Sequence, residues 1–300
     1  MPELPDIALY LHALTPRIVK RQLQRVRIAS PFLVRSVDPP LSAIEGQTVQ
    51  GLDRIGKRIV LQFNDELFCV LHLMIAGRFR WKSPGAPVPG RIGLAAFDFE
   101  GGTLLLTEAS PKKRASLQLV RGRQALAELD PGGIDPLAAS LEQFTERLEI
   151  ENHTLKRSLT DPRLFSGIGN AYSDEILHAA QLSPLLLTSR LTDGQMERLY
   201  EATRVTLTAW VERLIAEASD TFPQRVTAFR EGMAVHGRYG KPCPRCGAAV
   251  QRIAYADSEC DYCAVCQTDG RLLADRSLSR LLKDDWPRTL DELEIRKRRQ

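Results

Sequence analysis

The stretch CPRC at residues 243–246, followed after sixteen residues by CAVC at 263–266, decides how the end of this chain folds. The spacing C-x2-C-x16-C-x2-C is typical of a zinc ribbon, in which two short knuckles each supply two thiolates. Four thiolates complete a tetrahedral coordination sphere and leave no position for water, so we expect one structural Zn2+ rather than a catalytic ion. The predicted ligands are Cys243, Cys246, Cys263 and Cys266. Cys260 is an alternative ligand, because it forms a second C-x2-C pair with Cys263.

The composition is that of an ordinary globular protein. The chain has 300 residues, of which 43% are hydrophobic and 26% charged, and its net charge is only +4. This mildly basic balance is weak evidence for a nucleic-acid partner by itself. The sequence contains no apolar run of the ~18–20 residues needed to span a bilayer, and its start lacks the pattern of a signal peptide. We therefore predict a cytoplasmic protein with no membrane partner and no nucleotide cofactor, and expect a monomer.

The first part of the chain is predicted to form one helix followed by strands in which apolar and polar residues alternate. Helical periodicity covers residues 4–20 and begins at Pro5, whose fixed backbone angle suits a first turn. Short, partly alternating segments follow, and such spacing favours a β-sandwich or flattened barrel. The predicted strands are Gln24–Ile28, Arg58–Phe63, Leu67–Ile75, Arg78–Trp81, Gly93–Phe99 and Thr103–Thr107. The segment LDPGGIDP at 129–136 is rich in helix breakers and predicts a linker.

Beyond the linker the period becomes helical, which makes the whole chain an α+β protein. The predicted helices are Leu137–Leu148, Thr154–Thr160, Ala171–Ala180 and Asp193–Ala218, with a further amphipathic helix at Leu272–Leu282. An irregular stretch, Ser219–Met233, is long enough to be a functional or disordered loop. The predicted domains are 1–130 (β-sandwich), 137–236 (helical), 237–270 (a four-cysteine zinc-ribbon hairpin) and 271–300 (a C-terminal extension).

A glycine-rich turn opens the third predicted helix. In FSGIGNAYSDE at 165–175, two glycines precede Asn170 and a helix start, where backbone N–H groups and the helix dipole suit a phosphate. The alternative is an ordinary tight turn. Lys156 on the preceding helix could face the same anion, or it could simply be solvated.

The N-terminus is a third candidate site. If Met1 is removed, Pro2 becomes a free secondary amine, which can attack an aldehyde-level sugar carbon and form an iminium ion. Glu3 would lie beside it as a general acid or base. Alternatively, the segment Met1–Pro5 is only a stiff lead into the first helix.

Five features together resemble the formamidopyrimidine-DNA glycosylase and endonuclease VIII family. They are MPELP at 1–5, GKR at 56–58, His72-Leu73 followed by Gly77, GIGN at 167–170 and the four-cysteine ribbon. The resemblance covers roughly residues 2–268. It implies a β-sandwich behind a helix, a helical domain with a helix-two-turn-helix, and a zinc-finger hairpin, with double-stranded damaged DNA as the partner.

The resemblance also implies roles for individual residues. Pro2 would attack C1′ of the damaged nucleotide with Glu3 as its acid/base partner, while Lys57 and Asn170 would contact phosphates. The damaged base would be flipped out of the stack. By position, Ser219–Met233 corresponds to the family's lesion-covering loop.

Several positions depart from the family's pattern. Asp6 stands where the family usually has Glu, and Ile75 or the adjacent Met74 stands where the family has an intercalating Met. The family's Asp-Pro-Arg-Arg-Phe-Gly motif is replaced by SPKKRA at 110–115, which keeps a basic Arg114 but has no aromatic wedge. Ser258 replaces the hairpin Arg that assists δ elimination, and Arg252 or Arg271 could substitute for it.

The sequence thus predicts a bifunctional DNA glycosylase and AP lyase that excises oxidised purines or formamidopyrimidines. Two alternatives stay open: a non-catalytic protein that binds damaged or abasic DNA, and an AP lyase or oxidised-pyrimidine glycosylase. The excised lesion, the opposite base, the occurrence of δ elimination and the roles of Cys260 and the 271–300 extension do not follow from the sequence.

Overall fold

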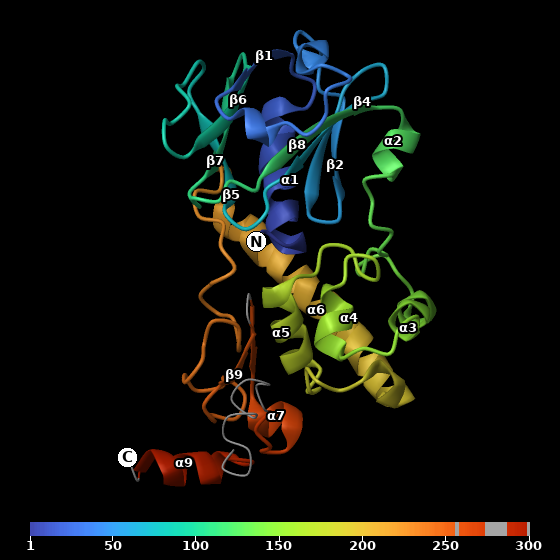
Figure 1. Ribbon diagram of the computed structural model, residues 1–300, viewed down its shortest axis with the longest axis vertical. Helices are drawn as coiled ribbons and strands as arrows, with labels where there is room; N and C mark the ends of the chain where they lie inside the picture. The colour runs from blue at the N-terminus through green and yellow to red at the C-terminus, as the bar shows by residue number, and fades with distance from the viewer. Residues whose placement is uncertain (256–257, 274–286, 299–300) are drawn as a thin grey trace. The chain divides into compact units, whose positions relative to one another are not determined.

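A computed structural model describes residues 1–255, 258–273 and 287–298 and divides the chain into two compact units (Figure 1). The N-terminal unit consists of Met1–Gly133 and Ala209–Ala228, and the second unit consists of Ile134–Thr208 and Phe229–Gln300. The division after Gly133 falls inside the linker predicted over 129–136. The sequence analysis placed Ala209–Ala228 in the helical domain, whereas the structure packs this segment with the N-terminal unit.

The N-terminal unit contains one long helix, eight strands and short helical turns. In chain order they are α1 (Leu4–Ile18), β1 (Leu23–Ile28), η1 (Pro31–Leu33), η2 (Leu41–Ile44), β2 (Gly51–Ile55), β3 (Arg58–Gln62), β4 (Leu67–His72), β5 (Gly77–Lys82), β6 (Gly93–Phe99), β7 (Gly102–Glu108), β8 (Ser116–Arg121) and α2 (Arg123–Ala127).

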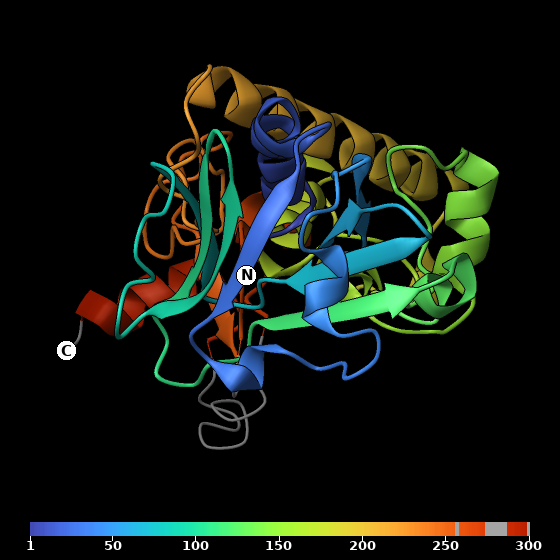
Figure 2. The ribbon, with the colours of Figure 1, turned by 90° about the horizontal axis from the view of Figure 1, so that it is seen from above.

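The eight strands form two separate antiparallel sheets (Figure 2), with strand orders β1-β6-β7-β5 and β2-β3-β4-β8. Neither sheet closes on itself, so the β-sandwich expected from the strand spacing is confirmed and a barrel is excluded. Every residue of β7 is buried, as is β4 except its last residue, because both strands lie inside their sheets. These apolar runs are therefore the core of the unit.

Helix α1 contacts both sheets. It packs against β2 and β3, and the ring of Tyr10 meets Phe79 of β5 edge-on with 5.4 Å between centroids. The helix begins with a capping box: the backbone N–H of Glu3 donates to the Asp6 carboxylate (3.0 Å), and the Glu3 side chain accepts from the backbone of Asp6. Such reciprocal bonds satisfy the first free N–H groups of a helix.

The second unit is mainly helical and ends in a two-stranded hairpin. Its elements are α3 (Leu141–Glu149), α4 (Leu155–Thr160), α5 (Asn170–Ala179), η3 (Thr188–Arg190), β9 (Gln251–Ala254), β10 (Glu259–Tyr262), α7 (Ala264–Thr268) and α9 (Leu290–Arg298). The long helix α6 (Asp193–Ala218) contributes residues to both units. Within the described ranges, no helix is both long and apolar enough to cross a bilayer.

Some predicted elements need correction. Strands β2 and β8 were missed, and the strand predicted over Leu67–Ile75 ends at His72. It ends there because Met74 has a left-handed backbone (φ 52°), which starts the turn to β5. The helix predicted at Leu272–Leu282 lies almost entirely outside the described residues.

The turn between β4 and β5 requires a glycine at its end. The N–H of Gly77 donates to the Leu73 carbonyl (2.8 Å), and a Cβ at Gly77 would lie 2.2 Å from that oxygen. We expect Gly77→Ala to lower the free energy of unfolding by about 3 kcal/mol, because the clash is with backbone that cannot move aside. Urea unfolding of the purified variant measures this loss.

Gly101→Ala is the matched control, because a Cβ at Gly101 would meet no atom within 4 Å. Equal stabilities of the two variants would show that the turn adjusts to a side chain.

Candidate active site and metal centre

The N-terminus lies inside its unit rather than in solvent. Pro2 is buried, Glu3 is 3% exposed and Asp6 is 1% exposed. The carboxylate of Asp6 belongs to the capping box, so at this position Asp reaches the backbone N–H of Glu3 and fixes the direction in which the chain enters α1. The position of Pro2 is thus set by a helix cap.

The N-terminal amine is surrounded by charged groups. Burial lowers the pKa of the Met1 amine, Arg78 and Lys57 lower it further, and Glu3 and Asp6 oppose this shift. A lower pKa increases the fraction of neutral amine near pH 7, which is the nucleophilic form. The predicted catalytic residues Glu3 and Lys57 are thus both near enough to the Met1 amine to influence its pKa.

Lys57 occupies the tip of a two-residue hairpin between β2 and β3. Ile55 pairs with Arg58, and Gly56 has a positive φ of 59°, as at the first central position of a type II′ turn. His72 at the end of β4 pairs with Arg58. Burial lowers the pKa of His72 to about 4, with Arg58 and Lys57 adding to the effect, so its ring is neutral at pH 7.

The predicted wedge residues lie in the turn after β4. Ile75 is 57% exposed, whereas Met74 is partly buried. Arg78, which the sequence analysis did not single out, holds this turn: its Nη1 donates to the carbonyls of Ile75 (3.1 Å) and Gly77 (2.6 Å). Of the two candidates, Ile75 is the side chain that the turn presents to solvent.

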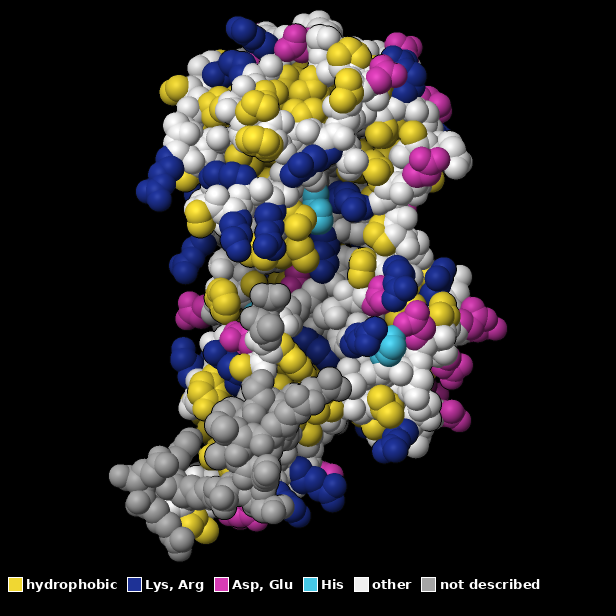
Figure 3. Space-filling model, in the orientation of Figure 1, with side chains coloured by type: hydrophobic (Ala, Val, Ile, Leu, Met, Phe, Trp, Pro, Cys, Tyr) yellow, Lys and Arg dark blue, Asp and Glu magenta, His cyan; other side chains and the backbone are white. Residues whose placement is uncertain are grey.

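The basic loop before β8 is organised by a buried carboxylate. Glu108 is 1% exposed, and its Oε2 accepts the backbone N–H groups of Arg114 (2.9 Å) and Ala115 (3.0 Å). The ammonium of Lys113 donates to the Glu108 carbonyl, and Arg114 itself is exposed. The loop thus has a fixed backbone. Figure 3 shows Lys and Arg side chains gathered on the visible face of the N-terminal unit.

The second unit carries the other predicted DNA-binding residues. Asn170 is the first residue of α5, and its amide Nδ2 donates to the Glu259 carbonyl of the hairpin (2.8 Å). Lys156 is 9% exposed, and its ammonium lies 2.5 Å from Asp174 and 2.6 Å from the Asn170 carbonyl. The Lys156 ammonium is therefore paired inside the unit, as a buried ammonium requires, and a contact of Lys156 with DNA stays a prediction.

Asp174 and Glu175, inside the glycine-rich motif, connect α5 to the segment that precedes the zinc ribbon. Glu175 accepts three backbone N–H groups, those of Ala234, Val235 and His236, at 2.7–2.9 Å. Asp174 accepts from the His236 ring (2.8 Å), which raises the pKa of that imidazole against the effect of burial. Only their buried setting reveals this role, since paired acidic residues in a helix usually face solvent.

The hairpin contains Ser258 and Arg252, the arginine suggested as a substitute for the one that Ser258 replaces. Ser258 is exposed in the β9–β10 turn. Arg252 bonds Asp261 (2.9 Å) and Glu259 (2.9 Å) and lies over the Tyr239 ring. Its charge is therefore balanced by two carboxylates, which argues against the suggestion that Arg252 takes over the missing function.

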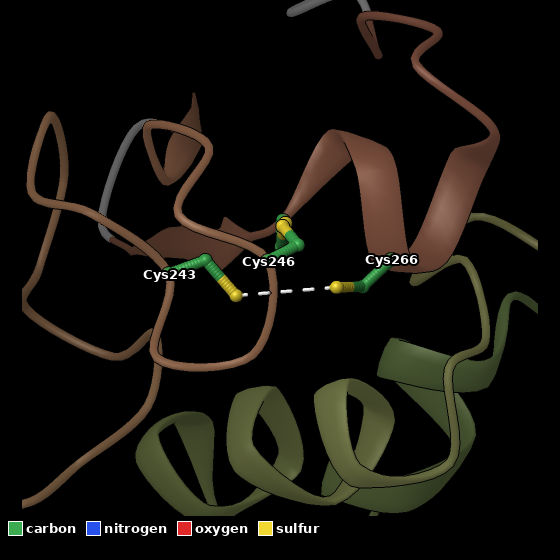
Figure 4. A group of neighbouring side chains, drawn as sticks. Cys243, Cys246 and Cys266 are labelled. Atoms are coloured by element: carbon green, nitrogen blue, oxygen red, sulfur yellow. Dashed lines mark hydrogen bonds between the residues drawn. The ribbon is translucent and has the colours of Figure 1, made fainter.

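The four cysteines selected by their spacing are gathered in space. Their sulfur atoms all lie within 4.8 Å of one another, with 3.9 Å between Cys243 and Cys266 and 3.4 Å between Cys246 and Cys263. Figure 4 shows Cys243 and Cys266 pointing toward each other. Thiolates about 2.3 Å from a tetrahedral zinc ion are about 3.8 Å apart, so this group fits Zn2+. Cys260 is buried outside the group.

Known proteins share both the domains and the fold of this chain. Residues 1–116 match the formamidopyrimidine-DNA glycosylase N-terminal domain, and residues 133–220 match the formamidopyrimidine-DNA glycosylase H2TH domain. The chain is 30% identical to a formamidopyrimidine-DNA glycosylase of Symbiobacterium thermophilum over 284 residues, which cover 89% of each protein.

Solved structures from Lactococcus lactis are also similar. A complex between the formamidopyrimidine-DNA glycosylase of that organism and DNA containing Fapy-dG has a TM-score of 0.78, with 26% identity, and covers 89% of this chain and 100% of that chain. A complex of the same enzyme with DNA containing an oxidised pyrimidine has the same TM-score, identity and coverage.

The cysteine geometry predicts which thiols hold the metal. We expect Cys243→Ser to lose bound zinc and to unfold the ribbon, since binding of a structural zinc contributes on the order of 10 kcal/mol to folding. Zinc content after gel filtration and chelator treatment is the measurement.

Cys260→Ser is the control, and it should keep one zinc per chain. A variant at Cys243 that retains full zinc, or one at Cys260 that loses it, would overturn this ligand set.

Proposed function

Because the chain belongs to the formamidopyrimidine-DNA glycosylase family, we propose that it excises oxidised bases from double-stranded DNA and then cleaves the abasic site as a lyase. The observation that carries this proposal is that Pro2 is buried next to Glu3, at a terminus where burial, Arg78 and Lys57 lower the pKa of the Met1 amine. A phosphate-binding protein without catalysis needs no such amine.

The reaction starts with the neutral amine of Pro2 after removal of Met1. Its lone pair forms a bond to C1′ of the damaged nucleotide, and the glycosidic bond breaks, so that the base leaves with the bonding electrons and takes up the proton that the Pro2 nitrogen loses. Glu3 donates a proton to the ring oxygen as the nitrogen lone pair opens the C1′–O4′ bond, which gives an iminium ion between Pro2 and the open sugar.

The imine then acts as an electron sink. Loss of a proton from C2′ lets the electrons move toward the imine, and the 3′-phosphate leaves with the C3′–O bond electrons. Lys57, at the hairpin tip, is suited to balance the charge of the leaving phosphate. Water finally hydrolyses the imine and regenerates Pro2, so the chain needs no redox cofactor for this sequence.

The second unit contributes binding rather than bond breaking in this proposal. The N-terminus of α5, with Asn170 as its first residue, is suited to phosphate contacts, and Ile75 of the N-terminal unit would fill the space left by the flipped base. The four cysteines hold the hairpin in shape when zinc is bound and take part in no chemical step.

The substrate class we favour is formamidopyrimidines and oxidised purines. A similar Lactococcus enzyme was solved with Fapy-dG DNA, which supports this class. The same enzyme was also solved with DNA containing an oxidised pyrimidine, which keeps an oxidised-pyrimidine glycosylase as the second candidate.

Borohydride trapping tests the imine. We expect the protein lacking Met1 to form a covalent adduct with a duplex containing an abasic site, and Pro2→Gly to form at least about 100-fold less, because glycine supplies only a primary amine in an altered position. Parallel duplexes with Fapy-dG, 8-oxoguanine and an oxidised pyrimidine rank the substrates by rate.

Glu3→Gln is the companion variant and should bind the abasic duplex but trap it slowly. Tight binding to every duplex without any adduct would replace this proposal by the non-catalytic damage binder.

The product ends test the consequence of Ser258. Because Ser258 carries no charge and Arg252 is neutralised by Asp261 and Glu259, we expect cleaved strands to end mainly in the unsaturated sugar of β elimination. Denaturing gels resolve this end from a 3′-phosphate.

Ser258→Arg should increase the share of 3′-phosphate ends. If the unmodified protein already gives mostly 3′-phosphate, another residue performs δ elimination.

A further inference from the structure

The segment Asp220–Ala228 is anchored on the N-terminal unit at several points. The Asp220 carbonyl accepts from Arg17 Nη2 (2.7 Å). Phe222 is 5% exposed and packs against the Tyr10 ring, with Arg17 over its face. The Val226 carbonyl accepts from Arg78 Nε (2.6 Å). This segment, which is part of the predicted lesion-covering loop, therefore packs against α1 and β5.

Arg78 joins this segment to the turn that presents Ile75. While its Nε bonds Val226, its Nη1 bonds the carbonyls of Ile75 (3.1 Å) and Gly77 (2.6 Å). A guanidinium is suited to this task, because it is planar and presents several N–H donors in a fixed fork. Lysine cannot reproduce this geometry, since its ammonium is a point charge on a flexible stem.

The same guanidinium acts on the N-terminal amine. The charged groups that influence this amine are Glu3 and Asp6 of α1, Lys57 of the β2–β3 hairpin and Arg78 of β5. His72 lies on β4, but its pKa of about 4 leaves it neutral above pH 5. One side chain therefore contacts two recognition elements of the proposed function and also influences the N-terminal amine.

We infer that Arg78 is a positioning residue, which holds the Ile75 turn and the Asp220–Ala228 segment in register beside the N-terminal amine. This inference rests on the proposed function for its link to catalysis. It assigns to one guanidinium the coupling between wedge insertion, closure of the segment over a lesion and attack by the amine.

Two variants separate the effect of the guanidinium hydrogen-bond geometry from the effect of its positive charge. Arg78→Lys keeps the positive charge and loses the fork, whereas Arg78→Met loses both. Lys82→Met is the matched control. Lys82 lies on the same strand and is exposed, and its replacement by Met removes the same positive charge. Far-UV circular dichroism and thermal unfolding verify that each variant is folded.

Limited trypsin digestion tests the hydrogen bond between Arg78 and Val226 in the protein alone, without DNA and without an activity measurement. Arg225 is exposed within the anchored segment, so cleavage after it reports local opening. Both Arg78 variants should be cut there about tenfold faster than the unmodified protein or Lys82→Met, because opening no longer breaks the Val226 bond. Unchanged cleavage in both variants would overturn the inference, whatever the protein does to DNA.

The pH profile of borohydride trapping on an abasic-site duplex tests the link to the amine. A positive neighbour lowers the pKa of an amine, so its loss raises that pKa. The rising limb of the profile should move to higher pH in Arg78→Met and stay in place in Arg78→Lys and Lys82→Met. An unmoved limb in Arg78→Met would remove the electrostatic part of the inference.

Excision of a lesion base under single-turnover conditions should fall about tenfold or more in both Arg78 variants, because misplacement of positioned groups slows a reaction by up to about 100-fold. Normal excision in both variants would overturn the positioning role. Absence of any Pro2-dependent adduct in the unmodified protein would instead overturn the proposed function, and the trypsin result would still decide whether Arg78 holds the segment.

Discussion

Burial of the first residues is the constraint on which the N-terminal unit depends. A chain terminus normally stays in solvent, because its charge is costly to bury. Here the capping box between Glu3 and Asp6 directs the chain into α1, and Tyr10 then meets both Phe79 of the sheet and Phe222 of the anchored segment. The burial that costs stability also lowers the pKa of the amine. The same burial therefore fixes the start of α1 and lowers the pKa of the terminal amine.

In the second unit, buried carboxylates join α5 to the hairpin beside two apolar clusters, one around Val250 and one around Ile253. Asp174 lies between Lys156 and His236, Glu175 accepts three backbone N–H groups, and Asp261 accepts from Arg252 and from the backbone of Gly237. Buried carboxylates need such partners to remain in the interior. The consequence is that α5, the segment before the ribbon and the hairpin form one connected unit, whose shape does not depend on the four thiols alone.

Local sequence rules predicted the helices and strands whose formation depends on the residues within each segment. Alternation and turn residues indicated Gly93–Phe99 as a strand to the residue, and helical periodicity with a capping residue indicated Asp193–Ala218. Strand Gly51–Ile55 was missed, because it is short, polar on its exposed side and recognisable only by its pairing with Arg58–Gln62. The extra length given to Leu67–Ile75 has a similar cause, since Met74 is apolar but takes a left-handed turn conformation.

The sequence by itself determined the two-part α+β organisation, the cysteine spacing and the proline terminus with Glu3 and Lys57, because these follow from residue types and short spacings. Only the tertiary structure decided that Lys156 and Arg252 are occupied by Asp174 and Asp261, and that Arg78 joins Ile75 to Val226. The partners of Lys156 and Val226 are 18 and 148 residues away along the chain. No local sequence pattern predicts such pairs, because the need to pair these polar groups arises only when folding removes both partners from water.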